Sequence, residues 1–322
     1  MEELLRKGHC VIGIDNYSKY GLVKKSYDSH PNYTFVKGDV KKTKLLINLL
    51  KKCDYIVAGA AKIGGIGYFH QYPYDLLAEN ERIIASTFDA AIYAFKHLSL
   101  KKIVIISSSM VFESTKIFPT PETAISLSPP PVSTYGFQKL AGEYFARGAW
   151  EQYKLPYTIV RPFNCVGVGE SEALGGKKVK SGNIKMAMSH VVPDLIYKTL
   201  KGQDPIHILG SGKQIRHFTY GGDIASGIVL AIFSPGAVNN DFNISSEKST
   251  TILKLARLIW KKNNPQKPFR YICDKPFIYD VQKRIPDVSK SKKILGFEAE
   301  TSLDEMIDKV TNWMKKQFLP IK

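Results

Sequence analysis

Cysteine is scarce in this chain, and its scarcity excludes two classes of protein. Only four of the 322 residues are cysteines, and no two of them form a Cys-x-x-Cys pair; they are Cys10, Cys53, Cys165 and Cys273. A scattered set of this kind provides neither the framework of a disulfide-rich secreted domain nor a zinc site. We therefore expect reduced thiols, no metal centre and a cytoplasmic protein.

The chain also lacks the long apolar stretches that a membrane protein needs. Its longest apolar runs, such as 224–233, are far shorter than the roughly 20 residues of a membrane-spanning helix. The opening residues 1–7 have the pattern of an amphipathic helix and contain no apolar core of a signal peptide. We expect no membrane association. With 44% apolar residues, the chain can bury one large core or two smaller ones.

Acidic residues are fewer than basic ones, which raises the question of nucleic acid binding. The chain has 46 Lys and Arg against 29 Asp and Glu, a net charge of +17. Yet the lysines occur as short pairs, such as Lys24-Lys25 and Lys51-Lys52, without a long basic run or a nucleic-acid motif. We therefore do not expect nucleic acid as a partner. The positive charge would instead attract an anionic substrate such as a sugar diphosphate.

The first half of the chain alternates apolar strands with helical stretches. We predict strands at Cys10–Ile14, Thr34–Val36, Tyr55–Val57, Ile103–Ile106 and Tyr157–Val160, and helices at Lys44–Lys52, Leu76–His97 and Tyr135–Tyr153. This alternation predicts an α/β fold with a Rossmann-like, doubly wound parallel sheet. We expect a dinucleotide-binding domain over 1–164. The remainder, 165–322, would form a smaller, mainly substrate-binding α/β lobe, with some segments returning to the sheet.

The strongest chemical signal is the pair Tyr135-x-x-x-Lys139. A tyrosine and a lysine four residues apart lie on one face of a helix, and the ammonium is expected to lower the pKa of the phenol from about 10. Such a phenol is a usable general base for a sugar hydroxyl. Ser108, just after the strand Ile103–Ile106, can hydrogen-bond the same oxygen. The pattern favours an oxidoreductase-type sugar enzyme; the alternative is an ordinary exposed Tyr–Lys pair.

Asp15 ends the first predicted strand, where a dinucleotide fold places its acidic contact to the adenosine ribose. The glycine-rich phosphate loop should lie about 20 residues earlier, which falls before residue 1. We expect that the sequence is N-terminally shortened and lacks the first strand and this loop. The alternative is a cofactor held without the usual pyrophosphate cradle. A missing central strand would leave strand edges unpaired.

Taken together, the chain resembles an extended short-chain dehydrogenase/reductase of the nucleotide-sugar epimerase/dehydratase type. The matching stretches occur in order along the sequence: Val36–Val40, Gly59–Ala61, Arg161–Asn164, Gly210–Arg216 and Asp280–Asp287. The resemblance implies a nucleotide-diphosphate sugar as substrate and a homodimer formed through the helices around 76–97 and 135–153. It also implies NAD as the cofactor, with NADP disfavoured because the carboxylate of Asp15 would repel a 2′-phosphate.

The resemblance further assigns roles to individual residues. The implied catalytic residues are Tyr135, Lys139, Ser108 and His190. The implied cofactor contacts, besides Tyr135 and Lys139, are Asp15, Asn16, Asp39, Val40, Ala60, Ala61, Lys62, Ser107 and Pro162. The implied substrate contacts are Ser109, Asn164, His190, Val191, Arg216 and Arg284. Alternatives stay open: the arginines as surface residues, Asn164 as a turn residue only, and Asp39 as a helix cap.

Two stretches are similar to GDP-fucose synthase and GDP-mannose 3,5-epimerase, namely Ala60–Ile66 and Ser189–Pro193. By this resemblance His190 would act as an acid next to a ketone; its alternative is a helix-start histidine bonded to the backbone. The cysteine that partners the histidine in those enzymes falls at Met110, and a thioether cannot take a proton. Double epimerisation through a Cys–His pair is therefore not expected.

Dehydration is not expected either, because Ser109 and Met110 stand where 4,6-dehydratases have an Asp-Glu pair. The favoured function is NAD-dependent epimerisation at the sugar C4 through a transient 4-keto sugar. One alternative is an NADPH-dependent 4-keto-sugar reductase/epimerase like GDP-fucose synthase. The other is a catalytically impaired relative that binds a nucleotide sugar or RNA.

Overall fold

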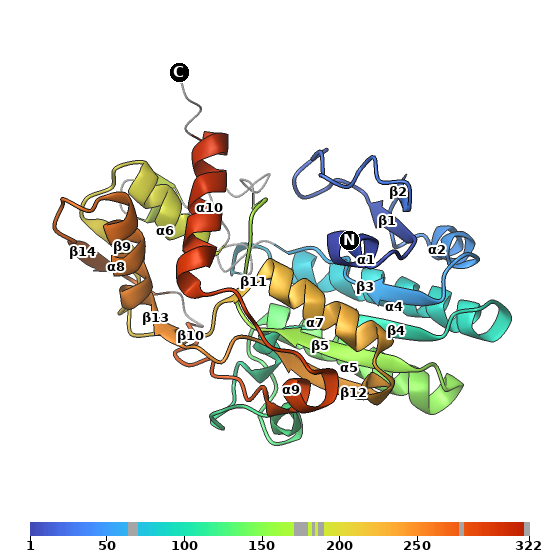
Figure 1. Ribbon diagram of the computed structural model, residues 1–322. Helices are drawn as coiled ribbons and strands as arrows, with labels where there is room; N and C mark the ends of the chain where they lie inside the picture. The colour runs from blue at the N-terminus through green and yellow to red at the C-terminus, as the bar shows by residue number, and fades with distance from the viewer. Residues whose placement is uncertain (64–69, 171–179, 182–183, 186–189, 277–279, 319–322) are drawn as a thin grey trace.

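The centre of the molecule is a parallel sheet of four strands in the order β12-β5-β4-β3 (Figure 1). The computed structural model describes residues 1–63, 70–170, 180–181, 184–185, 190–276 and 280–318. The four strands are β3 (Tyr55–Ala58), β4 (Lys102–Ile106), β5 (Tyr157–Pro162) and β12 (Asn240–Ile244). β4 and β5 are almost entirely buried, as expected of apolar strands that helices cover on both faces.

The first two strands form a sheet of their own. β1 (Val11–Asp15) and β2 (Tyr33–Lys37) pair in parallel, with Val11 opposite Tyr33. The parallel α/β class is as predicted, but the five predicted strands are divided between two sheets. The reason is that, in the described part of the chain, no strand pairs with the second edge of β1 or of β3. Val57 in β3 accordingly remains 37% exposed.

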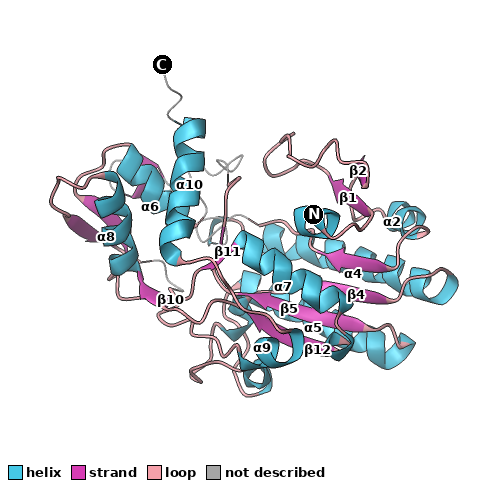
Figure 2. Ribbon diagram, in the orientation of Figure 1, coloured by secondary structure: helices cyan, strands magenta, loops and turns pink. Residues whose placement is uncertain are grey.

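Helices cover both faces of the main sheet (Figure 2). One face carries α2 (Thr43–Leu50), α4 (Pro73–His97) and α5 (Thr134–Tyr153). They bury a core that includes Leu46, Phe88 and Ala146 against Ile103 and Ile159 of the sheet. The other face carries α1 (Glu2–Arg6), α7 (Gly221–Phe233) and α9 (Ser289–Leu295), whose core includes Val104, Ile224 and Phe242. The helices predicted from sequence around 44–52, 76–97 and 135–153 are therefore present.

A second lobe is built mostly from the C-terminal half. Its parallel strands β9 (Ile206–Leu209) and β14 (Tyr271–Asp274) pack with α6 (Val191–Leu200), α8 (Ile252–Asn263) and α10 (Leu303–Phe318) around Leu195, Ile259 and Ile307. Short paired strands join it to the sheet domain: β6 (Cys165–Val166) with β11 (Thr219–Tyr220), and β10 (Ile215–Arg216) with β13 (Thr250–Thr251). The remaining short elements are β7 (Lys180–Ser181), β8 (Ile184–Lys185), η1 (Ser109–Phe112), η2 (Glu122–Ser126) and η3 (Pro235–Ala237).

β12 belongs to the C-terminal half of the sequence but pairs in parallel with β5, with Asn240 opposite Thr158. This segment therefore returns to the main sheet. The division of the chain into 1–164 and 165–322 stays a prediction.

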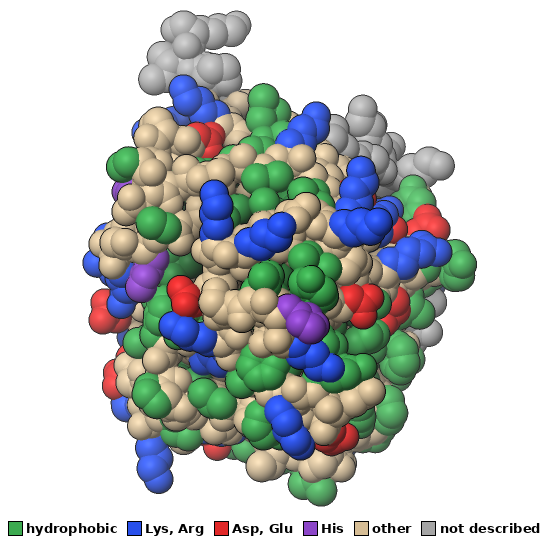
Figure 3. All heavy atoms as spheres, turned by 90° about the vertical axis from the view of Figure 1, so that its right-hand side faces the viewer, with side chains coloured by type: hydrophobic (Ala, Val, Ile, Leu, Met, Phe, Trp, Pro, Cys, Tyr) green, Lys and Arg blue, Asp and Glu red, His purple; other side chains and the backbone are tan. Residues whose placement is uncertain are grey.

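The surface matches the scattered charge of the sequence. On the face shown in Figure 3, basic side chains lie apart from one another among hydrophobic and neutral ones. No helix among the described residues combines the length and apolarity that crossing a bilayer requires. All four cysteines are free thiols.

Candidate active site

The predicted catalytic residues meet where β4 ends and α5 begins. Ser108 precedes η1, and its Oγ accepts a hydrogen bond from the Met110 backbone N at 3.2 Å. Tyr135 is the second residue of α5, a helix capped by Ser133, whose Oγ accepts from the Gly136 N at 3.1 Å. The hydroxyls of Ser108 and Tyr135 share a hydrogen bond. The structure therefore brings together the serine and the tyrosine singled out from the sequence.

The close approach of α5 to η1 depends on Gly136. A Cβ at this position would lie 2.7 Å from the Met110 backbone oxygen and 2.6 Å from the Pro131 Cβ. Backbone atoms cannot give way at such distances without moving the helix. A glycine next to Tyr135 thus lets α5 come near enough for the tyrosine to reach Ser108.

The pKa shifts of Tyr135 and Lys139 differ from the expectation. Burial raises the pKa of Tyr135, against the Ser108 hydrogen bond and the positive charge of Arg284, both of which lower it. The predicted lowering of this pKa by Lys139 is therefore wrong. Burial also lowers the pKa of Lys139 to about 8, against the opposing effect of the Glu143 charge. The Lys139 Nζ donates to the Ile106 carbonyl at 2.9 Å. Burial disfavours the charged form of both groups, and this outweighs their neighbours.

The residues predicted at the adenosine end lie at the carboxyl ends of β1 and β2. Asp15 ends β1, is exposed, and its Oδ1 accepts from the Tyr17 N at 2.6 Å. Asn16 follows it, and its Oδ1 accepts from the Ser18 N at 3.0 Å. These bonds fix the turn after β1 and hold the Asp15 carboxylate at the sheet edge.

Asp39 and Val40 occupy the corresponding place after β2. The Asp39 Oδ1 accepts from the Lys41 N at 2.9 Å, which stabilises the turn before α2. The Val40 carbonyl accepts from the Ser86 Oγ of α4 at 2.7 Å. Asp39 therefore stabilises this turn but does not cap α2, whose N-cap is Lys42 without a side-chain hydrogen bond. The turn contact is compatible with a cofactor contact.

The segment Gly59–Lys62 leaves β3 at the same edge. Asn80 of α4, which is only 1% exposed, holds it: the Asn80 Oδ1 accepts from the Lys62 N at 2.7 Å, and the Asn80 Nδ2 donates to the Lys62 carbonyl at 3.0 Å. Ala60 is exposed and Ala61 partly so. Sequence reasoning missed Asn80, since nothing near it in the sequence indicates a contact with residue 62. Residues 64–66 of the predicted Ala60–Ile66 stretch lie outside the described residues.

Two further predicted cofactor contacts, Ser107 and Pro162, lie at the carboxyl ends of β4 and β5. Ser107 is buried, and its Oγ donates to the Glu143 Oε1 at 2.6 Å, so its hydroxyl points into the protein. Pro162 ends β5 and is partly buried.

Residues suited to both ends of a dinucleotide are thus present at the carboxyl edge of parallel strands, where such cofactors bind. Asp15 offers a carboxylate for a ribose, and Lys139 lies beside Tyr135 at the opposite end. Among the described residues, no glycine-rich turn opens a helix directly after one of these strands.

The predicted substrate residues converge from three segments. Asn164 has a positive φ of 40°, a conformation that asparagine tolerates better than most residues. Its Oδ1 accepts from the Arg284 Nη1 at 3.5 Å, and its Nδ2 donates to the His217 carbonyl at 3.2 Å. The Arg284 backbone N donates to the Ile215 carbonyl at 3.2 Å, next to Arg216. The alternative that Asn164 is only a turn residue does not account for its contact with Arg284.

Arg216, which is buried, and Arg284, which is partly buried, form a pair of cations. Arg216 donates to the carbonyls of Ile215 at 2.9 Å and Val281 at 2.6 Å, and its Nη2 lies 3.7 Å from Asp280. Burial, together with the charge of Arg284, lowers the pKa of Arg216 to about 9, and burial also lowers the pKa of Arg284. Neither is a surface arginine. Two guanidinium groups that share one nearby carboxylate make a site suited to a dianion such as a diphosphate.

His190 caps α6 and is paired with a carboxylate. Its Nδ1 lies 2.8 Å from the Glu170 Oε2, and its backbone N donates to the Glu170 Oε1 at 3.0 Å. Glu170 has no sequence signal and was not predicted. Val191 begins α6, and Ser109 is buried at the start of η1. Met110 beside it is also buried.

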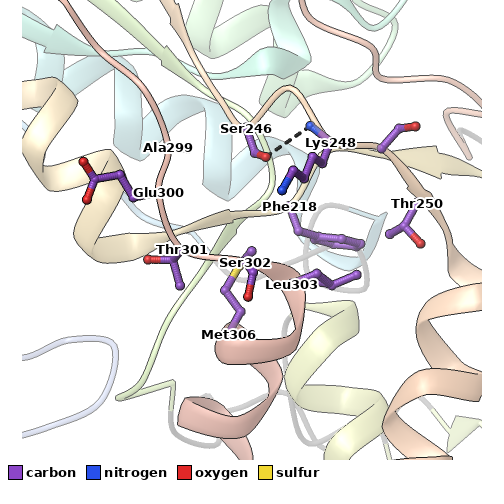
Figure 4. Close-up of a pocket in the computed structure, with 11 residues that line it drawn as sticks. Phe218, Ser246, Lys248, Thr250, Ala299, Glu300, Thr301, Ser302, Leu303 and Met306 are labelled. Carbon is purple, nitrogen blue, oxygen red and sulfur yellow. Dashed lines mark hydrogen bonds between the residues drawn. The ribbon is translucent and has the colours of Figure 1, made fainter.

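A small cavity of about 50 Å³ lies near the start of α10 (Figure 4). Phe218, Ser246, Thr250 and Met306 are among the side chains that line it. Ligand pockets usually measure about 300–1,000 Å³, so this cavity is too small for a nucleotide sugar. None of the residues predicted to bind cofactor or substrate lines it.

A parallel α/β fold with a Tyr–Ser pair and a lysine at its carboxyl edge defines a Rossmann-like, dinucleotide-dependent type of enzyme. Comparison with known proteins identifies the family. The profile of the "NAD dependent epimerase/dehydratase family" matches residues 1–245, and the chain belongs to this family. The predicted resemblance and the expectation of an NAD-dependent enzyme are confirmed at this level.

Individual relatives agree with the family assignment. An uncharacterized UDP-glucose epimerase of Bacillus subtilis is 26% identical over 94% of this chain and 90% of its own length. A putative GDP-L-fucose synthase of Oryza sativa is 26% identical over 79% of this chain and 69% of its own length. Among solved structures, a UDP-glucose 4-epimerase from Thermotoga maritima, crystallised with UDP-glucose, has a TM-score of 0.81 and 25% identity, covering 98% of this chain and 94% of its own.

Proposed function

We propose that this protein is an NAD-dependent epimerase that inverts C4 of a nucleotide-diphosphate sugar. One arrangement carries the proposal: the Tyr135–Ser108 pair with Lys139 on the same helix, next to the Arg216–Arg284 pair, of which Arg284 acts on Tyr135 through its charge. A base for a sugar hydroxyl and a site for a diphosphate thus occur together. The UDP-sugar epimerases among the relatives support this choice of substrate class.

The protein's own groups would divide the work as follows. Tyr135 takes the proton from the 4-hydroxyl and later returns it, while Ser108 holds the same sugar oxygen through its hydroxyl. Arg216 and Arg284 hold the diphosphate. The carboxylate of Asp15 binds the adenosine ribose hydroxyls and disfavours NADP. When bound, NAD would accept hydride from C4 and return it to the opposite face of the transient 4-keto sugar.

A second candidate is an NADPH-dependent 4-keto-sugar reductase/epimerase. The His190–Glu170 pair favours it, because a carboxylate orients the imidazole for proton exchange at half-exposed His190. Met110 stands where a second acid would be needed, which argues against double epimerisation. Turnover that consumes reduced cofactor in proportion to product would identify the reductase. An epimerase consumes none.

The test is an assay of the purified chain, first for bound cofactor and then for turnover. After denaturation we expect released NAD in near-stoichiometric amount and little NADP. Incubation with UDP-glucose, UDP-glucuronate or UDP-N-acetylglucosamine should convert one of them to its C4 epimer, detected by proton NMR, without net change in reduced cofactor. A chain that holds no NAD when supplied with it, and converts no sugar nucleotide, would instead be a non-catalytic binder.

We also propose that the protein is a homodimer formed through α4 and α5. An apolar groove of about 600 Å³ runs along these helices, lined by side chains that include Phe88, Ile92, Phe137 and Tyr144. Tyr144 is 63% exposed and Phe137 is nearly half exposed. A continuous apolar surface of this kind marks an interaction site, and a second copy of the same two helices matches its character.

Tyr144→Glu should therefore convert the dimer into a monomer, because it places a charge in the apolar contact. Analytical ultracentrifugation would show the loss of half the molecular mass. The matched control is Val238→Glu, which changes another exposed apolar residue, 43% exposed and outside this groove, and should leave the dimer intact. A wild-type protein that sediments as a monomer at every concentration would contradict the proposal.

A further inference from the structure

A carboxylate lies fully buried directly beneath the candidate active site. Glu143 of α5 is 0% exposed, and neither sequence motif nor family resemblance singled it out. Its Oε1 accepts from the Ser107 Oγ at 2.6 Å and from the Arg161 Nε at 2.8 Å. Its Oε2 accepts from the Arg161 Nη2 at 2.6 Å. A buried charge is costly unless it is paired in this way.

The position of Glu143 on α5 relates it to the catalytic residues. Tyr135, Lys139 and Glu143 are spaced four residues apart, so they lie on one face of the helix. Lys139 donates to the carbonyl of Ile106, and Ser107, the next residue, donates to Glu143. Two adjacent residues at the end of β4 are thus held by two successive turns of α5. Ser108, which bonds Tyr135, follows immediately.

The charges around Glu143 come from four elements. Arg161 of β5 pairs with it and, through Nη2, with the Asp241 Oδ2 of β12 at 2.8 Å. Lys290 of α9 lies behind, with its Nζ 2.8 Å from the Asp241 Oδ1. Arg147 of α5 lies 3.8 Å from the Glu143 Oε2 and is partly exposed. Arg161 is thus shared between Glu143 and Asp241, whereas Lys290 pairs with Asp241; the Glu143 charge also acts on Lys139, one turn before it on α5.

We propose that Glu143 is a positioning residue for the reaction: it holds Ser107, and through it the end of β4, against α5, and it keeps the neighbouring Lys139 in its ammonium form. This proposal rests on the proposed function, since it takes Tyr135, Ser108 and Lys139 to be the catalytic residues. Glu143 itself is fully buried, so it would touch neither substrate nor cofactor.

The electrostatic part of the proposal has a definite sign. The Glu143 charge raises the pKa of Lys139, whereas burial lowers it to about 8. Removal of the charge lowers this pKa further, so less Lys139 is protonated at any given pH. The deficit is small at low pH, where the ammonium is complete with or without Glu143. It grows as pH rises through the Lys139 pKa.

The experiment compares Glu143→Gln with the wild-type protein in two readouts. The first is the pH dependence of Lys139 acetylation by acetic anhydride, followed on the Lys139 peptide by mass spectrometry. At pH 7 the variant should react several-fold faster, because a larger share of its Lys139 is unprotonated when the Glu143 charge no longer raises the Lys139 pKa. The second is kcat/KM against pH, where the ratio of variant to wild type should fall as pH rises. Unchanged Lys139 reactivity, or a ratio that does not vary with pH, would overturn the proposal.

Ser107→Ala is the matched control, because it removes the hydrogen bond between Ser107 and Glu143 and leaves the Glu143 charge in place. We expect a lower kcat with an unchanged KM and an unchanged Lys139 reactivity; an unchanged kcat would overturn the tethering role. Should Glu143→Gln fail to fold, Glu143→Asp replaces it. The shorter carboxylate keeps the charge but loses the reach to Ser107, so kcat should fall while Lys139 reacts as in the wild type. A fully active Glu143→Asp would equally overturn that role.

The two proposals fail separately. Acetylation of Lys139 requires no turnover, so it decides the role of Glu143 even if the protein converts no sugar nucleotide. Conversely, an active Tyr135→Phe variant would overturn the assigned base without changing the Lys139 result.

Discussion

Tyr135→Phe should reduce kcat/KM for the sugar nucleotide by about 10²–10⁴-fold, the range that a positioned general base contributes. The substitution removes only the hydroxyl that bonds Ser108 and leaves the ring on α5. Because burial raises the pKa of this phenol, the wild-type rate should itself increase with pH as the phenolate forms. Initial rates across a pH series, with circular dichroism as a check of folding, measure both effects.

The matched control is Tyr271→Phe in β14 of the second lobe, where the hydroxyl lies on an exposed side chain outside the site. It should leave kcat/KM within about twofold of wild type, as surface substitutions away from a site usually do. If Tyr135→Phe retained more than about a tenth of the wild-type rate, Tyr135 would not be the base. Bound NAD should be unaffected in extent or only mildly reduced, which separates loss of chemistry from loss of cofactor.

Much of the fold could be read from the sequence because its strands are continuous apolar runs. β3 begins at the predicted Tyr55, and β4 begins one residue before the predicted strand. A strand buried on both faces needs apolar residues at every position, which makes it visible locally. The division of the strands into two sheets was not predictable in this way. It depends on which edges find partners, and pairing is a property of the assembled chain.

The site was predictable to the extent that single residues carry chemistry. Tyr135, Ser108, Arg216 and Arg284 come together as the motifs imply. Ser107 does not face the same way as Ser108, since neighbouring residues of an extended segment point to opposite sides. Asn80 and Glu170 act on residues that are 18 and 20 positions away, respectively. Glu143 could have been predicted from the sequence, because it continues the four-residue spacing of Tyr135 and Lys139.

Arg161→Met should lower the free energy of unfolding by about 3–5 kcal/mol, the cost of leaving a buried partner charge unpaired. Arg161 is 0% exposed and bridges two carboxylates, Glu143 and Asp241. Methionine has a similar length and no charge, so Glu143 would lose its partner while the space stays filled. Urea unfolding followed by circular dichroism gives the difference directly.

The contrasting substitution is Arg147→Met, which removes a partly exposed arginine 3.8 Å from the same Glu143. Its cost should be about 0–1 kcal/mol, because a partly exposed arginine that lies 3.8 Å from its partner contributes little. Equal losses for the two variants would mean that burial of the pair does not matter, and a loss below about 1 kcal/mol for Arg161→Met would contradict the argument. The residue directly before Pro162 would then have no structural reason to be an arginine. If the prediction holds, the ion pairs of Arg161 connect β5 to α5 and to β12. In the stretch Arg161–Asn164, the first residue would then stabilise the fold, and the last would contribute to the substrate site through Arg284.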